Sequence, residues 1–131
     1  MTQNVSAIIL YNENKEFLLQ KRDTKTSRSP GKWGFFGGRI EENENKFEAV
    51  IREAYEELKY ALDDPKFITK KIINGKGEMN IFIEKYDNSQ EIILGEGESY
   101  GWFKIKEIKE LDMIEHDREA LLEIAEKIDF Y

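Results

Sequence analysis

The chain has 131 residues, of which 20 are Lys or Arg and 27 are Asp or Glu, giving a formal net charge of −7 at pH 7. This length suits one domain with one core, so we expect a single domain over residues 1–131. The acidic balance argues against binding of long nucleic acids through a basic surface. The absence of cysteine excludes disulfides and thiol chemistry. The sequence has no signal-like start and no apolar run near 18 residues, so we expect a cytoplasmic protein without membrane contact.

The first part of the chain is expected to form strands. Residues 5–11 are a β-rich apolar run, and a second run at 16–22 follows a turn-forming segment, which together predict a hairpin. Residues 23–31 are polar and are expected to form a surface loop. Residues 32–38 are expected to form a short aromatic strand, ending in paired glycines that allow a tight turn.

A helix carrying a carboxylate cluster is predicted after this turn. At about 100° per residue, its apolar residues fall on one stripe that packs on a core: Phe47, Val50, Ile51, Ala54, Leu58 and Ala61. Glu53, Glu56 and Glu57 fall on another face within one turn, so their oxygens can converge on a point outside the helix. Three anions there repel each other, and a hard divalent cation removes that repulsion. Ligands that are all oxygen indicate Mg²⁺ or Mn²⁺ rather than zinc.

A lone Glu-x-x-Glu-Glu is more often a solvated helix face, so the surrounding spacing is the deciding observation. The pattern is glycine, five residues, Glu, seven residues, Arg-Glu, two residues and Glu-Glu, and it resembles the signature of the Nudix hydrolases. It is met at Gly38, Glu44, Arg52, Glu53, Glu56 and Glu57.

Three positions depart from the family pattern. Lys59 stands where the family has glycine, Tyr60 stands where it has an aliphatic residue, and Phe36 stands where proline is commoner. Without a glycine to take a left-handed cap, we expect the helix to continue to about Leu62 and stop before Pro65.

The second half of the chain predicts further strands and a second helix. Strands are expected at 66–74, 79–86, 91–94 and 100–105, and an amphipathic helix at 116–128. This order, with strands on both sides of the first helix and a second helix at the end, matches the fold that the resemblance implies. That fold is an α/β/α sandwich with a mixed β-sheet between helices.

The resemblance also implies roles for the cluster. Family members hydrolyse a nucleoside diphosphate linked to another group, with metal ions holding the diphosphate. Glu53, Glu56 and Glu57 match the metal-binding glutamates, Glu53 also helps to activate water, and Arg52 orients the acidic cluster. Glu44 serves either in N-terminal capping of the helix or as an outer metal ligand.

Other site residues are expected outside the helix. A later loop often supplies a further catalytic glutamate in the family, and Glu98 is the better candidate, with Glu96 second; the alternative is a solvated acidic turn. Gly37 and Gly38 are expected to bring backbone N–H groups close to the metal helix and the substrate. Arg22, with Lys21, is a candidate for phosphate contact, against solvated strand-edge charge. Phe35, Phe36, Trp33 and Tyr100 are candidates for stacking on a base, although aromatic residues on strands are usually core.

The resulting hypothesis is a Mg²⁺-dependent Nudix pyrophosphohydrolase, similar in size to the MutT-type members. We expect a nucleoside triphosphate or modified nucleotide as substrate, giving a monophosphate and pyrophosphate. The alternatives are a dinucleoside polyphosphate or nucleotide-sugar hydrolase, and a catalytically silent nucleotide-binding regulator. The acidic chain requires cations and a few well-placed Lys or Arg to admit a polyphosphate. We expect a monomer or a homodimer.

Overall fold

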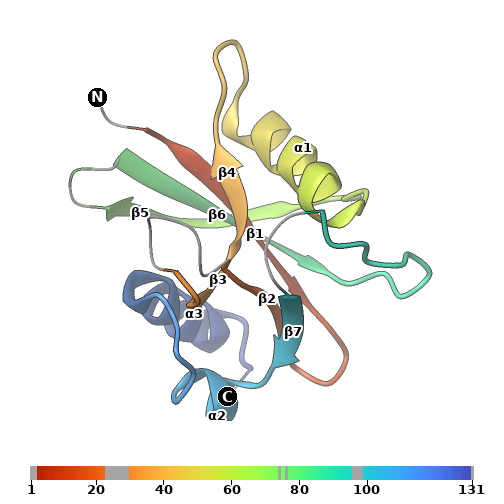
Figure 1. Ribbon diagram of the computed structural model, residues 1–131, viewed down its shortest axis with the longest axis vertical. Helices are drawn as coiled ribbons and strands as arrows, with labels where there is room; N and C mark the ends of the chain where they lie inside the picture. The colour runs from red at the N-terminus through yellow and green to blue at the C-terminus, as the bar shows by residue number, and fades with distance from the viewer. Residues whose placement is uncertain (1–2, 23–29, 74, 76, 96–98, 131) are drawn as a thin grey trace.

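The computed structural model describes residues 3–22, 30–73, 75, 77–95 and 99–130 (Figure 1). The strands are β1 (Val5–Tyr11), β2 (Phe17–Lys21), β3 (Trp33–Gly34), β4 (Phe36–Arg39), β5 (Lys66–Ile73), β6 (Gly77–Lys85) and β7 (Ser99–Phe103). The helices are α1 (Lys46–Leu58), α2 (Ile105–Ile108) and α3 (Glu115–Lys127). None of these described helices is long and apolar enough to cross a membrane.

The strands form one mixed sheet built around β1. Its main path runs β3-β2-β1-β6-β5, while β4 pairs with β1 and β7 pairs with β2. Strands β1 and β6 are parallel, and the other pairs are antiparallel. Strand β1 therefore pairs with three neighbours, and the pairing with β4 fixes the position of the glycines that precede α1.

The central strands are apolar at successive positions because the sheet is covered on both faces. In β1, Ala7 and Ile9 face one core cluster, while Ile8 and Leu10 face the other. The same alternation holds in β6, where Ile81 lies in the first cluster and Phe82 in the second. A strand with period-two burial on both sides requires a packed layer on each side, and helices supply both layers.

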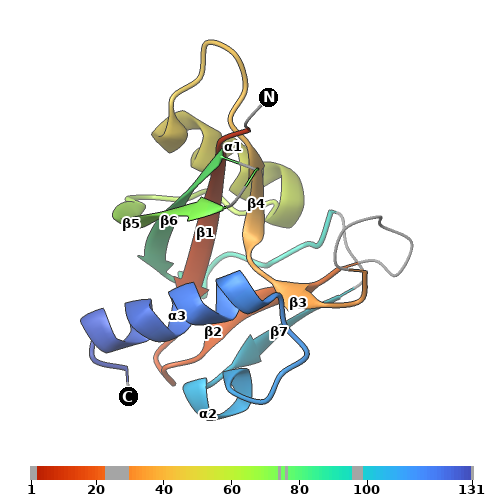
Figure 2. The same cartoon turned by 90° about the vertical axis from the view of Figure 1, so that its left-hand side faces the viewer.

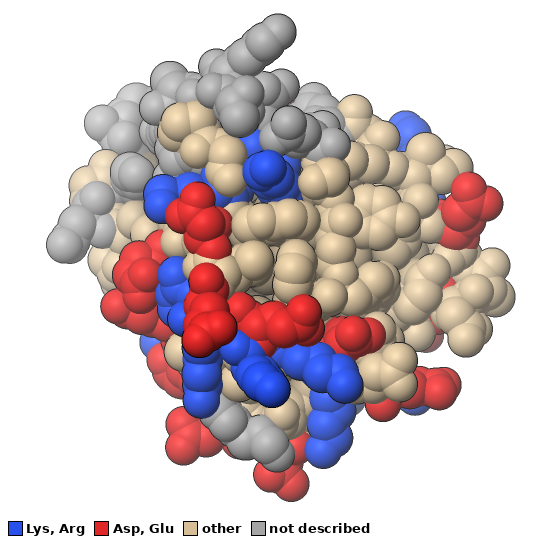
Figure 3. All heavy atoms as spheres, turned by 60° about the horizontal axis from the view of Figure 1, so that its bottom comes forward, with Lys and Arg blue, Asp and Glu red and all other residues tan. Residues whose placement is uncertain are grey.

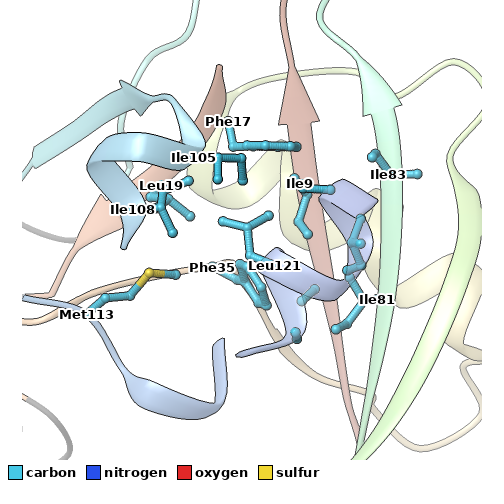
Figure 4. Close-up of a cluster of buried hydrophobic side chains, with 14 of the residues drawn as sticks. Ile9, Phe17, Leu19, Phe35, Ile81, Ile83, Ile105, Ile108, Met113 and Leu121 are labelled. Carbon is cyan, nitrogen blue, oxygen red and sulfur yellow. The ribbon is translucent and has the colours of Figure 1, made fainter. Parts of the chain in front are cut away.

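Helix α1 covers one face of the sheet, and α3 with the short α2 covers the other (Figures 1 and 2). Figure 4 shows Leu121 of α3 pointing into the cluster formed with Ile9, Phe17, Leu19 and Ile108. The predicted α/β/α sandwich with a mixed sheet is confirmed.

Several predicted features need correction. The single aromatic strand over 32–38 is two strands, because the backbone N–H of Phe35 bonds the Asp117 carboxylate of α3 instead of a neighbouring strand. The turn predicted at its paired glycines is also wrong, because Gly37 and Gly38 lie inside β4 and pair with Ala7 and Ser6 of β1. The strand predicted at 91–94 is wrong. Its backbone follows the end of α1, where the N–H of Ile93 bonds the carbonyl of Leu58 at 2.9 Å. The predicted strand 100–105 ends at Phe103, and Ile105 begins α2.

The predicted extension of α1 to Leu62 is also wrong. The helix ends at Leu58, and Lys59 adopts the left-handed conformation with φ 53° and ψ 32°. The fully buried Tyr60 provides the physical reason, because its ring packs in the core under α1 and its hydroxyl accepts a hydrogen bond from the Asp87 N–H. Burial of this ring offsets the cost of a left-handed lysine, which is about 1–2 kcal/mol.

Candidate functional site

The first turn of α1 is fixed by a reciprocal cap. The Asn45 side chain accepts from the Glu48 N–H at 2.7 Å, and the Glu48 carboxylate accepts from the Asn45 N–H at 3.0 Å. Asn45 therefore fills the capping role that the sequence offered to Glu44. Because α1 starts here, residues 53, 56 and 57 lie in the second half of the helix, within about one turn of one another.

The three glutamates on this face differ in exposure. The Glu53 side chain is 14% exposed and the Glu56 side chain 56%, whereas Glu57 is buried at 8%. A buried carboxylate needs a specific partner to offset its desolvation. The structure provides such a partner for Glu57 in the backbone N–H of Gly37.

The two glycines of β4, Gly37 and Gly38, are held directly against α1. The N–H of Gly37 donates to Glu57 Oε1 at 2.7 Å. Gly37 has φ +151°, and a Cβ there would lie 2.2 Å from the Ser6 carbonyl oxygen on β1. A Cβ at Gly38 would lie 2.6 Å from the Glu53 carboxyl group. Gly37 therefore requires glycine, because an added Cβ would meet backbone atoms, whereas at Gly38 it would displace the Glu53 carboxyl group. The absence of side chains lets the backbone approach the carboxylates.

Arg52 connects the carboxylates to each other. It forms a two-point ion pair with Glu44, with Nε–Oε2 at 2.7 Å and Nη2–Oε1 at 3.0 Å. Its Nη1 donates to Glu53 at 2.8 Å and to Glu56 at 3.2 Å. Its Nη2 also donates to the carbonyl of Arg39, the residue that follows Gly38. The guanidinium group is a fixed fork, so these contacts set the orientation of the whole cluster.

The charges of the cluster shift the pKa values of its members in opposite directions. The hydrogen bond from Arg52 lowers the pKa of Glu44 from 4.5 to about 2. The hydrogen bond with Glu44 raises the pKa of Arg52 still further above its usual range. Burial raises the pKa of Glu53, and the nearby Glu56 and Glu44 charges raise it further, while Arg52 opposes this. Glu53 therefore has a higher proton affinity than an ordinary glutamate.

The donor set fits a hard divalent cation by chemistry and charge. Glu53, Glu56 and Glu57 offer oxygen ligands only, and burial, together with the smaller effect of the Glu56 and Glu44 charges, raises the pKa of Glu53. Within the described ranges, however, no group of three Asp, Glu or His side chains is arranged to hold a metal ion. The Glu53 and Glu56 carboxylates face Arg52, and one Glu57 oxygen faces the Gly37 N–H.

The remaining predicted residues lie on parts of the chain other than α1 or outside the described residues. Arg22 follows β2, and its N–H donates to the Lys32 carbonyl at 2.9 Å. The Phe35 ring is only 8% exposed and packs in the core on the α3 side of the sheet, so it offers no free face for a base. Glu96 and Glu98 lie outside the described residues.

Some contributors to this region were not predicted from the sequence. The Glu41 carboxylate lies 3.2 Å from Arg52 Nε and extends the ion-pair network. The Gly95 N–H donates to the Glu57 carbonyl at 2.7 Å, so the chain after β6 is anchored behind the carboxylates. Asp117, which is 5% exposed, holds the strand break at Phe35. Local sequence carries no signal for these contacts, because each joins residues distant along the chain.

Comparisons with known proteins identify the family and the fold. The family model of the NUDIX domain matches residues 1–124. The crystal structure of a MutT Nudix hydrolase from Burkholderia pseudomallei is 25% identical with a TM-score of 0.75, covering 92% of this chain and 96% of that chain. No curated protein sequence matches the chain.

Two further solved structures share the fold. A MutT structure from work on Aliivibrio salmonicida and Vibrio cholerae is 20% identical with a TM-score of 0.82, covering 97% of this chain and 99% of that chain. A C. elegans Ap4A hydrolase binary complex is 16% identical with a TM-score of 0.78 and the same coverage. Because the NUDIX family model spans nearly the whole sequence, the chain belongs to the Nudix family of hydrolases.

Proposed function

We propose that this Nudix pyrophosphohydrolase acts on a nucleoside triphosphate or modified nucleotide, in a Mg²⁺-dependent reaction that releases a monophosphate and pyrophosphate. The observation that carries the proposal is the face of α1 that bears Glu53, Glu56 and Glu57. This face lies against Gly37 and Gly38, and Arg52 orients its carboxylates. Phosphoryl transfer depends mainly on charge neutralisation and positioning, and this arrangement serves both.

The three glutamates are the residues that would hold Mg²⁺ or Mn²⁺. When bound, the cation supplies the positive charge that a diphosphate needs beside these carboxylates. Arg52 and the Gly37 N–H keep the carboxylates in place on a rigid helix, which reduces the reorganisation required when substrate binds.

Glu53 is our candidate for the proton acceptor that activates water. Its raised pKa makes it a better base than an ordinary glutamate, and the Arg52 hydrogen bond fixes its orientation. Glu98 is the second candidate, because it follows Gly95, which is hydrogen bonded to the Glu57 carbonyl.

The backbone of Gly37 and Gly38 and the side chain of Arg22 are our candidates for substrate contact. Gly37 and Gly38 approach Glu53 and Glu57 closely, so the backbone of the two glycines lies beside the proposed diphosphate position. Phe35 does not contact the substrate in this proposal. Its backbone N–H donates to Asp117 in the core, and this bond fixes the chain just before Gly37.

A nucleotide panel tests the proposal directly. Purified protein is incubated with nucleoside triphosphates, dinucleoside polyphosphates and nucleotide sugars in Mg²⁺, and pyrophosphate, phosphate and nucleoside monophosphate are measured separately. We expect pyrophosphate and monophosphate in equal amounts from a triphosphate, and loss of turnover in excess chelator. Full turnover in chelator would contradict the role of the cation.

The same panel separates the alternatives. Cleavage confined to dinucleoside polyphosphates or nucleotide sugars would replace the triphosphate by another diphosphate substrate at the same site. Nucleotide binding without any product would instead indicate a silent regulator, against which the intact Glu53, Glu56 and Glu57 argue.

A further inference from the structure

A pocket of about 550 Å³ lies at the opposite end of the molecule from α1. It is lined by the β1–β2 turn, α2 and the C-terminal segment, which lie together at the bottom of Figure 1. Its lining residues are Asn14, Lys15, Lys104, Ile105, Lys106, Lys109, Glu110 and Phe130. Four lysines and one glutamate thus surround this pocket in a chain with net charge −7.

Several of the lysines at this pocket lack an ion-pair partner among the described residues, as do Lys46, Lys59, Lys66 and Lys85 elsewhere in the chain. Lys32, Lys70 and Lys71 each pair with a carboxylate. By contrast, Lys15, Lys104 and Lys106 form no ion pair with any described residue. In Figure 3, which brings the α2 end forward, the basic side chains on the lower part of this face lie among acidic ones. Unpaired positive charge around one concavity favours an anionic ligand.

The floor of the pocket is apolar and fixed. Phe130 follows Asp129, a left-handed residue with φ 58°, and its N–H bonds the Ala125 carbonyl at 2.8 Å at the end of α3. This cap turns the Phe130 ring onto Tyr11 and Phe17, with centroid distances of 5.2 and 5.4 Å. A rigid aromatic floor can contact the apolar part of a ligand.

Lys15 is held at the rim by a constrained turn. It has φ 61°, an unfavourable conformation for a non-glycine residue, and its Nζ lies 5.9 Å from the Phe130 ring centroid. Asn12 fixes the turn, since its carbonyl accepts from the Lys15 N–H and its side chain accepts from the Asn14 and Glu16 N–H groups. The turn therefore fixes the Lys15 backbone beside the aromatic floor.

We propose that this pocket is a second binding site, for a small organic phosphate whose anionic groups contact the lysines and whose ring or apolar part lies on Phe130 and Ile105. The volume is in the range of small-molecule sites, and the lysines surround one pocket rather than forming the long stripe that a nucleic acid requires. Because α1 lies at the other end of the molecule, occupancy here does not require the proposed catalytic carboxylates.

The test measures binding in excess chelator, which removes the proposed catalytic cation, with ATP, inorganic tripolyphosphate and adenosine as probes. Calorimetry gives the affinity, and amide chemical shifts locate the site. We expect ATP to bind more tightly than tripolyphosphate and much more tightly than adenosine, with shifts at residues 14–15, 104–110 and 130. Shifts confined to α1 and β4, or adenosine binding as tightly as ATP, would overturn the proposal.

Matched charge variants complete the test. Lys106→Gln with Lys109→Gln should weaken ATP binding by about tenfold, since two charged contacts to phosphate are lost. The control pair, Lys66→Gln with Lys70→Gln, removes the same charge from exposed positions on β5 and should change affinity by less than about twofold. Equal losses in the two pairs would show a general charge effect and contradict a defined pocket. A polyglutamate peptide that binds more tightly than ATP would replace the small ligand by an acidic segment and overturn the proposal.

Discussion

The N–H of Gly37 donates a 2.7 Å hydrogen bond to the buried carboxylate of Glu57, joining β4 to the last turn of α1. Gly37 also lies directly against Ser6 of β1, where a Cβ would be 2.2 Å from the carbonyl oxygen. The sheet therefore determines the position of Gly37, and Gly37 helps to position the carboxylate.

Gly37→Ala should strongly destabilise the protein. The new methyl group meets the backbone of Ser6 and Ala7, and the positive φ is unfavourable for alanine, so we expect a loss of roughly 3 kcal/mol or more in unfolding free energy. Urea unfolding measures it. Gly75→Ala is the control, because Gly75 has φ +72° but nothing within 4 Å of the added Cβ, and should lose only about 1 kcal/mol. Equal losses would mean that the close packing of Gly37 against β1 is unimportant for stability.

Glu56→Gln and Glu57→Gln should each lower turnover by at least about a hundredfold, because each removes a charged ligand of the cation. The cation is the group that neutralises the charge of the substrate. Glutamine keeps an oxygen that can accept from the Gly37 N–H, so we expect the fold to remain. Steady-state rates with Mg²⁺ and circular dichroism check both points. Glu119→Gln, an exposed change on α3, should leave the rate unaltered. Near-normal rates in both site variants would exclude this face of α1 as the catalytic centre.

Glu98→Gln should depress turnover with little change in substrate affinity, if the residues after Gly95 supply the proton acceptor. Glu96→Gln should do little and serves as the matched control. Rates at saturating Mg²⁺ and substrate compare the two variants. Unchanged turnover in Glu98→Gln would leave Glu53 as the proton acceptor, because Glu53 is the carboxylate whose pKa burial raises.

The Glu44–Arg52 pair should contribute pH-dependent stability. The folded-state pKa of Glu44 is about 2 against an ordinary value of 4.5. A carboxyl with a lowered pKa stabilises the fold above its unfolded-state pKa, and this contribution is lost as the pH falls through the folded value. The stability gap between the native protein and Glu44→Gln should therefore be largest near neutral pH and shrink as the pH falls from about 4.5 to about 2.

Urea unfolding at a series of pH values measures this gap. Glu119→Gln provides the comparison, since no ion pair of Glu119 with the described residues is present, and its gap should stay flat. A constant gap for Glu44→Gln would show that the Arg52 contact does not hold the carboxyl ionised.

Lys59→Gly should stabilise the protein by about 1 kcal/mol, because glycine adopts the left-handed conformation without the steric cost of a side chain. Asp129→Gly, at the equivalent left-handed position after α3, should act in the same direction. Thermal unfolding measures both. Glu119→Gly, inside α3, is the control and should destabilise by about 1 kcal/mol. Destabilisation by Lys59→Gly would show that the lysine side chain, which lies over the Tyr55 ring, matters more than the backbone strain.

Local patterns in the sequence determined the parts of the fold that depend on nearby residues. The apolar runs at 5–11 and 79–86 predicted strands, and the structure shows them buried on both faces as β1 and β6. The spacing of Arg52, Glu53, Glu56 and Glu57 predicted one shared helix turn, since helical geometry depends only on separation along the chain. Residues 116–128 likewise predicted α3 to within one residue.

Tertiary structure decided the features that depend on contacts between distant residues. Lys59 ends α1 because Tyr60 is buried beside Asp87. Residues 91–95 follow the end of α1 because the N–H groups of Ile93 and Gly95 donate to its last carbonyls. Glu44 braces Arg52 because Asn45 already caps the helix, and Phe35 lies in the core because Asp117 of α3 binds its backbone. A left-handed residue, a helix end and an ion-pair partner each reflect free energy gained from burial and hydrogen bonds across the fold, and no local pattern encodes it.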